Sequence, residues 1–262
     1  ILDCVFRGNH ADYGGAARRQ GTYTRCLFDN NSAAVSGGAY SEVTSFPVDH
    51  ARFIDCTFVD NSTNIQGGGA CYGGQEFINC RFIENESGLN DGGEFAPGGA
   101  IHARVPTTIT NCEFIGNSSS GAGGTTAGDA DVPVGISNST FVNNHSDLAG
   151  QAIFGGATIC NSIFGPHDDQ PLANVLSVDH PSLMHPPPSG VGGLGNVIGD
   201  PHFVNPLGAD GIAGTEDDDL RLRANYQTSF VAPSLADSGN KVDTRLQLAT
   251  LAPNVYRAFI GG

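Results

Sequence analysis

Residues 54–61 read Ile54-Asp-Cys56-Thr-Phe58-Val-Asp-Asn61, and the Cys-x-Phe-x-x-Asn unit inside this stretch returns along the chain. Five copies keep all three residues, and two more keep the phenylalanine but carry serine in place of cysteine. Successive copies start 22, 30, 24, 32, 27 and 23 residues apart. A period of this size, varied only by insertion, is typical of a solenoid in which each copy forms one coil. The copies start at Cys4, Cys26, Cys56, Cys80, Cys112, Ser139 and Ser162.

Within a copy, apolar and polar residues alternate as in a strand with one buried face. Ile54, Cys56 and Phe58 are expected to point inward, and Asp55 and Thr57 outward. The asparagine after each phenylalanine would end the strand, because its side-chain amide can bond to the equivalent residue one coil above. The repeat therefore predicts an interior phenylalanine column and an asparagine column at a corner. We expect the same inward register at Ile78, Ile109 and Ile136.

The chain has seven cysteines, five of them at the same position of the repeat. Coils stacked at the strand spacing of about 4.8 Å would place these five in one column. Parallel Cα–Cβ directions make the disulfide torsion hard to reach, so we expect buried free thiols that pack as small apolar residues. Cys71 and Cys160 have no obvious partner in the sequence.

A second motif follows the first in most copies: two glycines, or Gly-Gln, then alanine and commonly an apolar residue. It starts at Gly14, Gly37, Gly68, Gly98 and Gly150. Paired glycines allow a sharp bend, and the residues after them would begin another strand. The variable stretches between motifs, such as Ser118 to Pro133, are expected to be surface loops.

These paired motifs resemble the repeats of polymorphic outer-membrane proteins and related secreted bacterial right-handed parallel β-helices of the pectate-lyase-like fold. The likeness covers residues 1–164, and the stretches Asp200-Pro-His-Phe203-Val-Asn205 and Pro233-Ser-Leu-Ala-Asp237 are similar to the closing segment of such proteins. The resemblance implies an all-β, right-handed parallel β-helix solenoid of about seven coils in residues 1–164. A loop-rich, cap-like continuation would follow in residues 165–262.

Composition excludes several classes of partner. The chain has 27 carboxylates and 12 basic residues, a formal charge of −15 that repels nucleic acid and anionic membranes. No apolar run approaches the about 20 residues of a membrane-spanning helix, so no direct membrane insertion is expected. The opening Ile1-Leu-Asp-Cys4 is not a signal peptide, which indicates a processed chain or part of a longer product.

The densest acidic cluster predicts a metal site. Asp210, Asp217, Asp218 and Asp219 lie in a glycine-bent stretch, and hard cations such as calcium take several oxygen ligands from tight loops. The stretch lacks the regular alternation of an EF-hand loop, so a solvated acidic turn is the alternative. The stretch therefore predicts calcium at these four residues.

Two further groups of residues are candidates for catalysis. Asp60 and Glu84 occupy the same position in neighbouring copies, and paired carboxylates can serve acid–base hydrolysis or hold a metal. Adjacent copies carry no acid there, which favours a solvated face. Polysaccharide lyases with this fold use an arginine or lysine base beside carboxylate-bound calcium. None of the arginines on regular coils combines with three carboxylates: Arg25, Arg52, Arg81 and Arg104.

The function predicted from the sequence is a non-enzymatic extracellular or cell-surface role, adhesive or fibre-forming, carried by the long face of the coil. The alternative is a polysaccharide lyase or glycoside hydrolase that uses a sheet face as a carbohydrate groove. The expected partners are carbohydrate or the protein itself. The first coil begins at Ile1 with an open strand edge, so either further sequence covers it or coils of neighbouring subunits stack end to end into an oligomer or filament.

Overall fold

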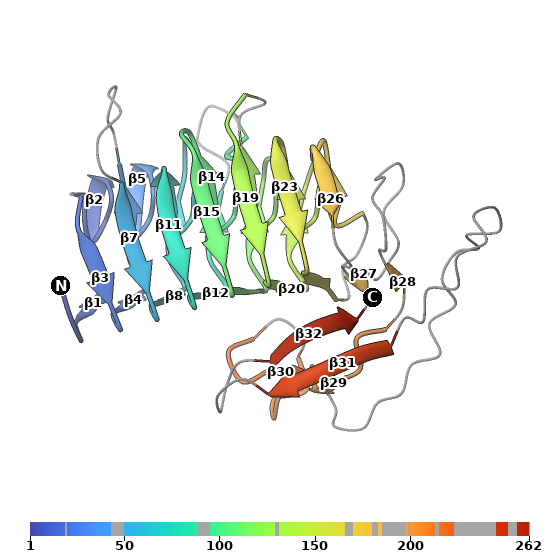
Figure 1. Cartoon of the computed structure of the whole chain (residues 1–262). Coiled ribbons are helices and arrows are strands. Elements are labelled where there is room, and N and C mark those ends of the chain that lie inside the picture. The colour runs from blue at the N-terminus through green and yellow to red at the C-terminus, as the bar shows by residue number, and fades with distance from the viewer. Residues whose placement is uncertain are drawn as a thin grey trace.

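The computed structural model is a parallel β-solenoid in which successive coils lie side by side (Figure 1). Every regular element in the described part of the chain is a β-strand, which confirms the all-β class. No helix in this part has the length and apolar character needed to cross a membrane. The structure describes residues 1–18, 20–42, 50–88, 95–128, 131–165, 170–179, 183–184, 197–198, 200–212, 215–222, 245–250 and 256–261.

Each Cys-x-Phe unit contributes one short strand to the phenylalanine sheet, and parallel pairing runs along the whole sheet. Its strands are β1 (Val5–Arg7), β4 (Leu27–Asp29), β8 (Thr57–Val59), β12 (Arg81–Ile83), β16 (Glu113–Ile115), β20 (Thr140–Val142), β24 (Ile163–Phe164), β27 (Leu183–Met184) and β28 (Val197–Ile198). The seven-stranded sheet precedes it in each coil. Its strands are β3 (Thr22–Thr24), β7 (Ala51–Ile54), β11 (Gln75–Ile78), β15 (Thr107–Thr110), β19 (Val134–Ser137), β23 (Ala157–Cys160) and β26 (Ser177–Asp179).

Two further parallel sheets complete the coils. The asparagine sheet follows the asparagine corner and contains β2 (His10–Tyr13), β5 (Ser32–Ser36), β9 (Ser62–Thr63), β13 (Glu86–Ser87), β17 (Ser118–Ser119) and β21 (His145–Ser146). The glycine sheet follows the paired-glycine bend and contains β6 (Tyr40–Ser41), β10 (Cys71–Gly73), β14 (Ile101–Ala103), β18 (Thr126–Gly128), β22 (Ile153–Phe154) and β25 (Leu172–Ala173).

The predicted phenylalanine column is confirmed and forms the centre of the core. Neighbouring rings lie 4.7–4.8 Å apart with planes within 7° of parallel, so each ring stacks on the next at the strand spacing. Phe53 and Phe77 of the seven-stranded sheet pack against this column edge-on. The column is Phe6, Phe28, Phe58, Phe82, Phe114, Phe141 and Phe164.

The predicted asparagine column is also confirmed, and its amides bond continuously from coil to coil. The Nδ2 of Asn61 donates to Oδ1 of Asn85 at 2.9 Å, and the same oxygen accepts the backbone N–H of Asn61 at 3.1 Å. Nδ2 of Asn61 also donates to the carbonyl of Phe28. Because these buried amides are paired in this way, the ladder avoids the cost of burying polar groups without partners. It runs through Asn9, Asn31, Asn61, Asn85, Asn117 and Asn144.

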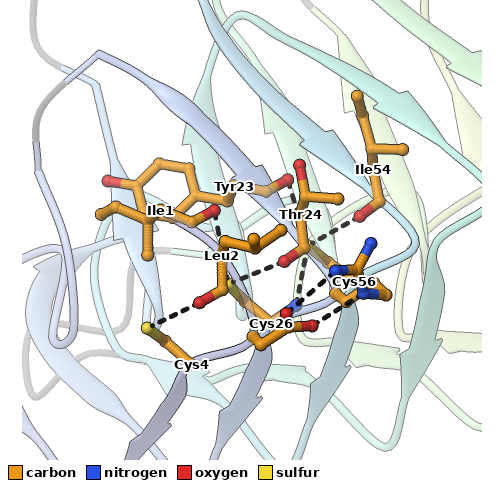
Figure 2. Close-up of polar contacts among 10 residues, drawn as sticks. Ile1, Leu2, Cys4, Tyr23, Thr24, Cys26, Ile54 and Cys56 are labelled. Atoms are coloured by element: carbon orange, nitrogen blue, oxygen red, sulfur yellow. Dashed lines mark hydrogen bonds and ion pairs between the residues drawn. The ribbon is translucent and has the colours of Figure 1, made fainter.

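The cysteines are free thiols, as predicted, and the column positions make hydrogen bonds (Figure 2). The thiol of Cys56 donates to the carbonyl of Ile54 at 3.3 Å, and its Sγ accepts the N–H of Cys26 at 3.4 Å. The hydroxyl of Ser139 makes the same two bonds, to the carbonyl of Ser137 and from the N–H of Cys112. Serine in the later copies therefore preserves the contact that cysteine makes in the earlier ones.

The corner before each cysteine corrects the predicted alternation. Ile54 to Phe58 is not one strand, because β7 ends at Ile54, Asp55 turns with φ of +54°, and β8 begins at Thr57. This single left-handed residue shifts the inward register by one. Phe53, rather than Ile54, is the fully buried residue of β7.

The prediction for the inward residue is wrong in the coil of Ile78 and right in the two coils after it. Phe77 is fully buried whereas the predicted inward residue Ile78 is only half-buried. Ile109 and Ile136 were placed inward and are 0% and 2% exposed, so the prediction was right for those two coils.

One coil contains strands where the sequence predicted only a loop. The stretch Ser118 to Pro133 holds β17 and β18, and Thr126 pairs with Ile101 on one side and Ile153 on the other. Gly123-Gly124-Thr125-Thr126 is therefore the missing copy of the second motif, with threonine in place of the apolar residue. Thr125, at the alanine position of the motif, donates its Oγ1 to the carbonyl of Ala152, whereas the buried Oγ1 of Thr126, at the apolar position, has no hydrogen-bond partner among the described residues.

After β28 the described strands form antiparallel hairpins. β29 (Phe203–Asn205) pairs with β30 (Asp219–Leu222), and β31 (Arg245–Thr250) pairs with β32 (Tyr256–Gly261). Residues 220–222 belong to β30 and lie outside the parallel sheets. The predicted motif Pro233 to Asp237 lies outside the described residues.

Candidate functional site

The outer face of the phenylalanine sheet carries a buried apolar column, although this face points away from the solenoid interior. The residue directly after phenylalanine is apolar in four consecutive copies, and the four lie in register on neighbouring strands. They are 8%, 0%, 0% and 0% exposed. We call this column the outer stripe: Val59, Ile83, Ile115 and Val142.

A C-terminal segment covers the outer stripe. We call residues 200–212 and 215–222 the strap; β29 and β30 are its two strands, and Figure 1 shows them beside the phenylalanine sheet. Leu220 of β30 packs against the cluster formed by Val59, Ile83 and Ile115. Phe203 of β29 is only 3% exposed. The strap is therefore a second layer on the solenoid.

Gly165 explains how Phe203 fits at the far end of the stripe. It occupies the position after phenylalanine in the last copy, where other copies carry a side chain. A Cβ at Gly165 would lie 2.9 Å from Cγ2 of Val142 and 3.0 Å from Cε2 of Phe203. Both distances are shorter than ordinary carbon contacts, so only glycine leaves room for the ring.

Asp217 organises the turn of the strap. Its carboxylate accepts hydrogen bonds from the N–H groups of Ala209 and Asp210 and from the hydroxyl of Thr215. These bonds, the Thr215 hydroxyl first, hold the pKa of Asp217 below its ordinary value. Gly208 has φ of +58°, and a Cβ there would lie 2.4 Å from the Asp217 carboxylate. The glycine is thus required by a close approach as well as by its backbone.

The strap brings its acidic residues next to the predicted pair of the solenoid. Burial raises the pKa of Glu84, and the negative charges of Asp60, Asp210 and Glu216 raise it further. Burial also raises the pKa of Asp60, with added contributions from Asp29 and Glu216. Two acidic features far apart in the sequence therefore form one carboxylate cluster at the edge of the outer stripe.

The four predicted calcium ligands have different roles in the strap. Asp217 closes the turn, and Asp219 forms an ion pair with Arg221 that lowers the pKa of the carboxyl. Asp218 is 7% exposed, and Asp210 accepts the N–H of Ile212 at 2.8 Å. Among the described residues, no group of three or more His, Cys, Asp or Glu side chains is arranged to hold a metal ion. Calcium binding stays a prediction.

A cleft of about 400 Å³ lies between the strap and the corner before the cysteine column. One wall is the strap segment 218–221, and the other consists of corner amides and outward side chains of the phenylalanine sheet. The corner amides bond to one another: Asn111 Nδ2 to Asn79 Oδ1, and Asn79 Nδ2 to Asp55 Oδ1. The cleft therefore combines an amide-rich corner with ion pairs on both sides, Arg81–Glu113 and Arg221–Asp219.

The arginines considered for lyase chemistry are held by carboxylates in three cases. Arg25 pairs with Asp3 at 2.7 Å, Arg52 with Glu76 at 2.7 Å and Arg81 with Glu113 at 3.0 Å. Each pair joins neighbouring coils. Solvent screening keeps the contribution of exposed pairs of this kind to stability small.

The sequence contained an overlooked signal for the outer stripe. After phenylalanine the copies carry Arg7, Asp29, Val59, Ile83, Ile115, Val142 and Gly165 in order. Apolar residues at a strand position that points outward indicate that something covers the face. The covering segment lies far along the chain and has no repeat period, so the repeat pattern does not identify it.

A comparison with protein families gives a match within the repeats. The Chlamydia polymorphic membrane protein repeat matches residues 25–39, which cover β4, the Asn31 corner, β5 and the Gly37-Gly38 bend. Searches of curated proteins and of solved structures gave no match. The matched repeat and the parallel solenoid together fit a β-helix repeat protein with repeats of the polymorphic membrane protein type, and they indicate a surface-exposed protein of the bacterial outer-membrane type.

Proposed function

We propose that this protein is a non-enzymatic adhesive module of the bacterial surface that binds through the outer face of its seven-stranded sheet. The matched repeat supports a surface role. The observation that carries the adhesive role is the regularity of this face, where outward side chains of successive strands lie in register over the length of the sheet.

The β15–β26 half of this face has a chemistry suited to binding. One outward row reads Thr108, Gly135, Thr158 and Ser177. Thr108 and Thr158 are exposed, and short hydroxyl side chains on a flat sheet present donors and acceptors at the regular spacing of stacked strands. An extended polymer with hydroxyl or amide groups, such as a carbohydrate chain, is the ligand that this row fits best.

The test is binding of purified protein to immobilised polysaccharides, compared with a Thr108→Glu/Thr158→Glu variant. The variant places two carboxylates on the row and is expected to abolish binding without unfolding the coil. Asn64→Glu/Leu148→Glu is the matched control, because it also adds two carboxylates, at exposed positions outside the seven-stranded sheet. Equal binding by the wild-type protein and the double variant would contradict the proposed face.

The same preparations distinguish this role from the alternatives. Reproducible release of soluble sugar from a polysaccharide would contradict the non-enzymatic role and favour lyase or hydrolase chemistry. The alternative non-enzymatic role is fibre formation, in which copies of the protein associate with one another. An apparent molar mass, measured by light scattering, that rises with the concentration of wild-type protein in the absence of carbohydrate would favour fibre formation over carbohydrate adhesion.

A further inference from the structure

Within the described part of the strap, few apolar side chains pack on the solenoid. Leu220 contributes the packing against the outer stripe, and Phe203 is buried beside Gly165. The pairing of β29 with β30 is short and irregular between Phe203 and Asn205. A two-stranded hairpin is marginally stable alone in water, so the order of the strap depends on its docking.

Like charge opposes the same docking. The solenoid side carries Asp29, Asp60 and Glu84, whereas the strap side carries Asp210, Glu216 and Asp218. Asp60 and Glu84 directly follow Val59 and Ile83 of the outer stripe, and Asp218 lies two residues before Leu220, which packs on that stripe, so carboxylates flank the contact on both sides. Carboxylates that approach one another in a partly desolvated contact repel more strongly than they do in bulk water.

The arginines on the neighbouring elements are engaged by other carboxylates. Arg7 of β1 pairs with Asp29, Arg81 of β12 with Glu113, and Arg221 of β30 with Asp219. The Arg7 pair neutralises part of the charge at Asp29 and leaves the Asp60–Glu84 segment as the main source of repulsion on the solenoid side.

We propose that the strap is a releasable cover, held on the outer stripe by Leu220 and Phe203 and loosened by repulsion between the carboxylates of its turn and those of Asp60 and Glu84. Screening this charge, or removing it by substitution, closes the cover. Release exposes the outer stripe and removes one wall of the cleft. The strap thus controls access to a face distinct from the adhesive face of the seven-stranded sheet.

The experiment measures hydrogen exchange of strap peptides by mass spectrometry in the full chain at neutral pH, low salt and with a metal chelator. Asp60→Asn/Glu84→Gln removes two charges isosterically from the contact. We expect strap amides to exchange about threefold or more slowly in this variant, while β11 amides stay unchanged. Asp12→Asn/Glu76→Gln is the matched control: it removes two charges elsewhere and is expected to leave strap exchange unchanged.

Salt provides a second, independent readout on the wild-type protein. Raising NaCl from about 10 mM to about 200 mM shortens the screening length from about 30 Å to under 10 Å, so strap exchange is expected to slow. The Asp60→Asn/Glu84→Gln variant should respond less. Unchanged or faster strap exchange in that variant, equal slowing in the control variant, or no response of the wild-type strap to salt would each overturn the proposal.

Discussion

The interior of the solenoid and the contact beneath the strap are both made from short strands, but different forces hold them. In the interior, each residue repeats the contact of the residue one coil below, as in the stack of Phe58, Phe82 and Phe114. Under the strap, Leu220 packs against a cluster to which three coils each contribute one residue, and this contact is not repeated from coil to coil. The repeated stacks of the interior therefore distribute stability along the whole solenoid. The strap depends instead on contacts, such as that of Leu220, that a single substitution can remove.

The largest effect is expected in the phenylalanine column. Phe82→Ala deletes a fully buried ring that stacks on both neighbours, and should lower the free energy of unfolding by about 3–5 kcal/mol. Phe95→Ala, at a ring that is 52% exposed, is the control and should change stability by less than about 0.5 kcal/mol. Denaturant titration measures both; similar losses would contradict the column as the centre of the core.

The asparagine ladder should be the next most sensitive feature. Asn85→Ala removes the acceptor of two bonds from Asn61 and the donor to Asn117, and leaves buried groups without partners. We expect a loss of about 2–4 kcal/mol. Asn64→Ala, at an exposed position in the preceding coil, is the matched control. A ladder variant as stable as this control would show that the amide bonds contribute little.

Overfilling at Gly165 should affect the strap more than the coils. Gly165→Val places methyl groups where Val142 and Phe203 already lie. We expect strap protection against exchange to fall by about 1–3 kcal/mol, the usual cost of overpacking, while β11 protection is retained. Loss of protection throughout the solenoid would mean that Gly165 serves the coil itself.

The pH dependence of the strap follows from the raised pKa values of Asp60 and Glu84. Their docked state binds protons more tightly than the released state, so docking strengthens as pH falls through the raised values. The gain ends near about pH 4, where the released carboxyls are protonated too. Below that, protonation of Asp217 and Asp219, whose pKa values are lowered, weakens the strap. Protection factors of strap amides should therefore pass through a maximum in mild acid; a steady decrease from neutral pH would contradict this sign.

Calcium is expected to have the smallest effect. If Asp210, Asp217, Asp218 and Asp219 bind the ion in the folded state, added calcium raises the melting temperature by mass action. Asp217 and Asp219 already have partners within the protein, so the gain should be small. Identical melting curves in calcium and in chelator, or an unchanged response after Asp217→Ala with Asp219→Ala, would count against the site.

The repeat itself made most of the fold predictable. The phenylalanine and asparagine columns followed from position alone, because stacked coils bring equal positions together. The predicted inward positions were wrong at Ile54 and Ile78. A left-handed residue follows each of them, Asp55 or Asn79, and it interrupts the alternation of inward and outward side chains although the spacing of the motif in the sequence stays the same. Asparagine and aspartate tolerate that backbone, so their recurrence before the cysteine was the available signal.

The candidate site was less predictable, because it joins residues more than a hundred positions apart. Asp60 and Glu84 were recognised as neighbours, and the acidic stretch at Asp210 was recognised separately. Their proximity depends on the docking of Leu220 onto the outer stripe and of Phe203 beside Gly165, contacts that lie outside the period. Only the apolar residues after phenylalanine indicated that the face is covered.

The position of the strap can be tested most directly by photo-crosslinking from residue 220. A benzophenone amino acid replaces Leu220, which is only half-buried, and crosslinked peptides are identified by mass spectrometry after irradiation of the full chain. The structure predicts insertion into the side chains of Val59, Ile83 or Ile115. Crosslinks confined to other sheets, or none to residues 57–115, would contradict the claim that the strap covers the outer stripe.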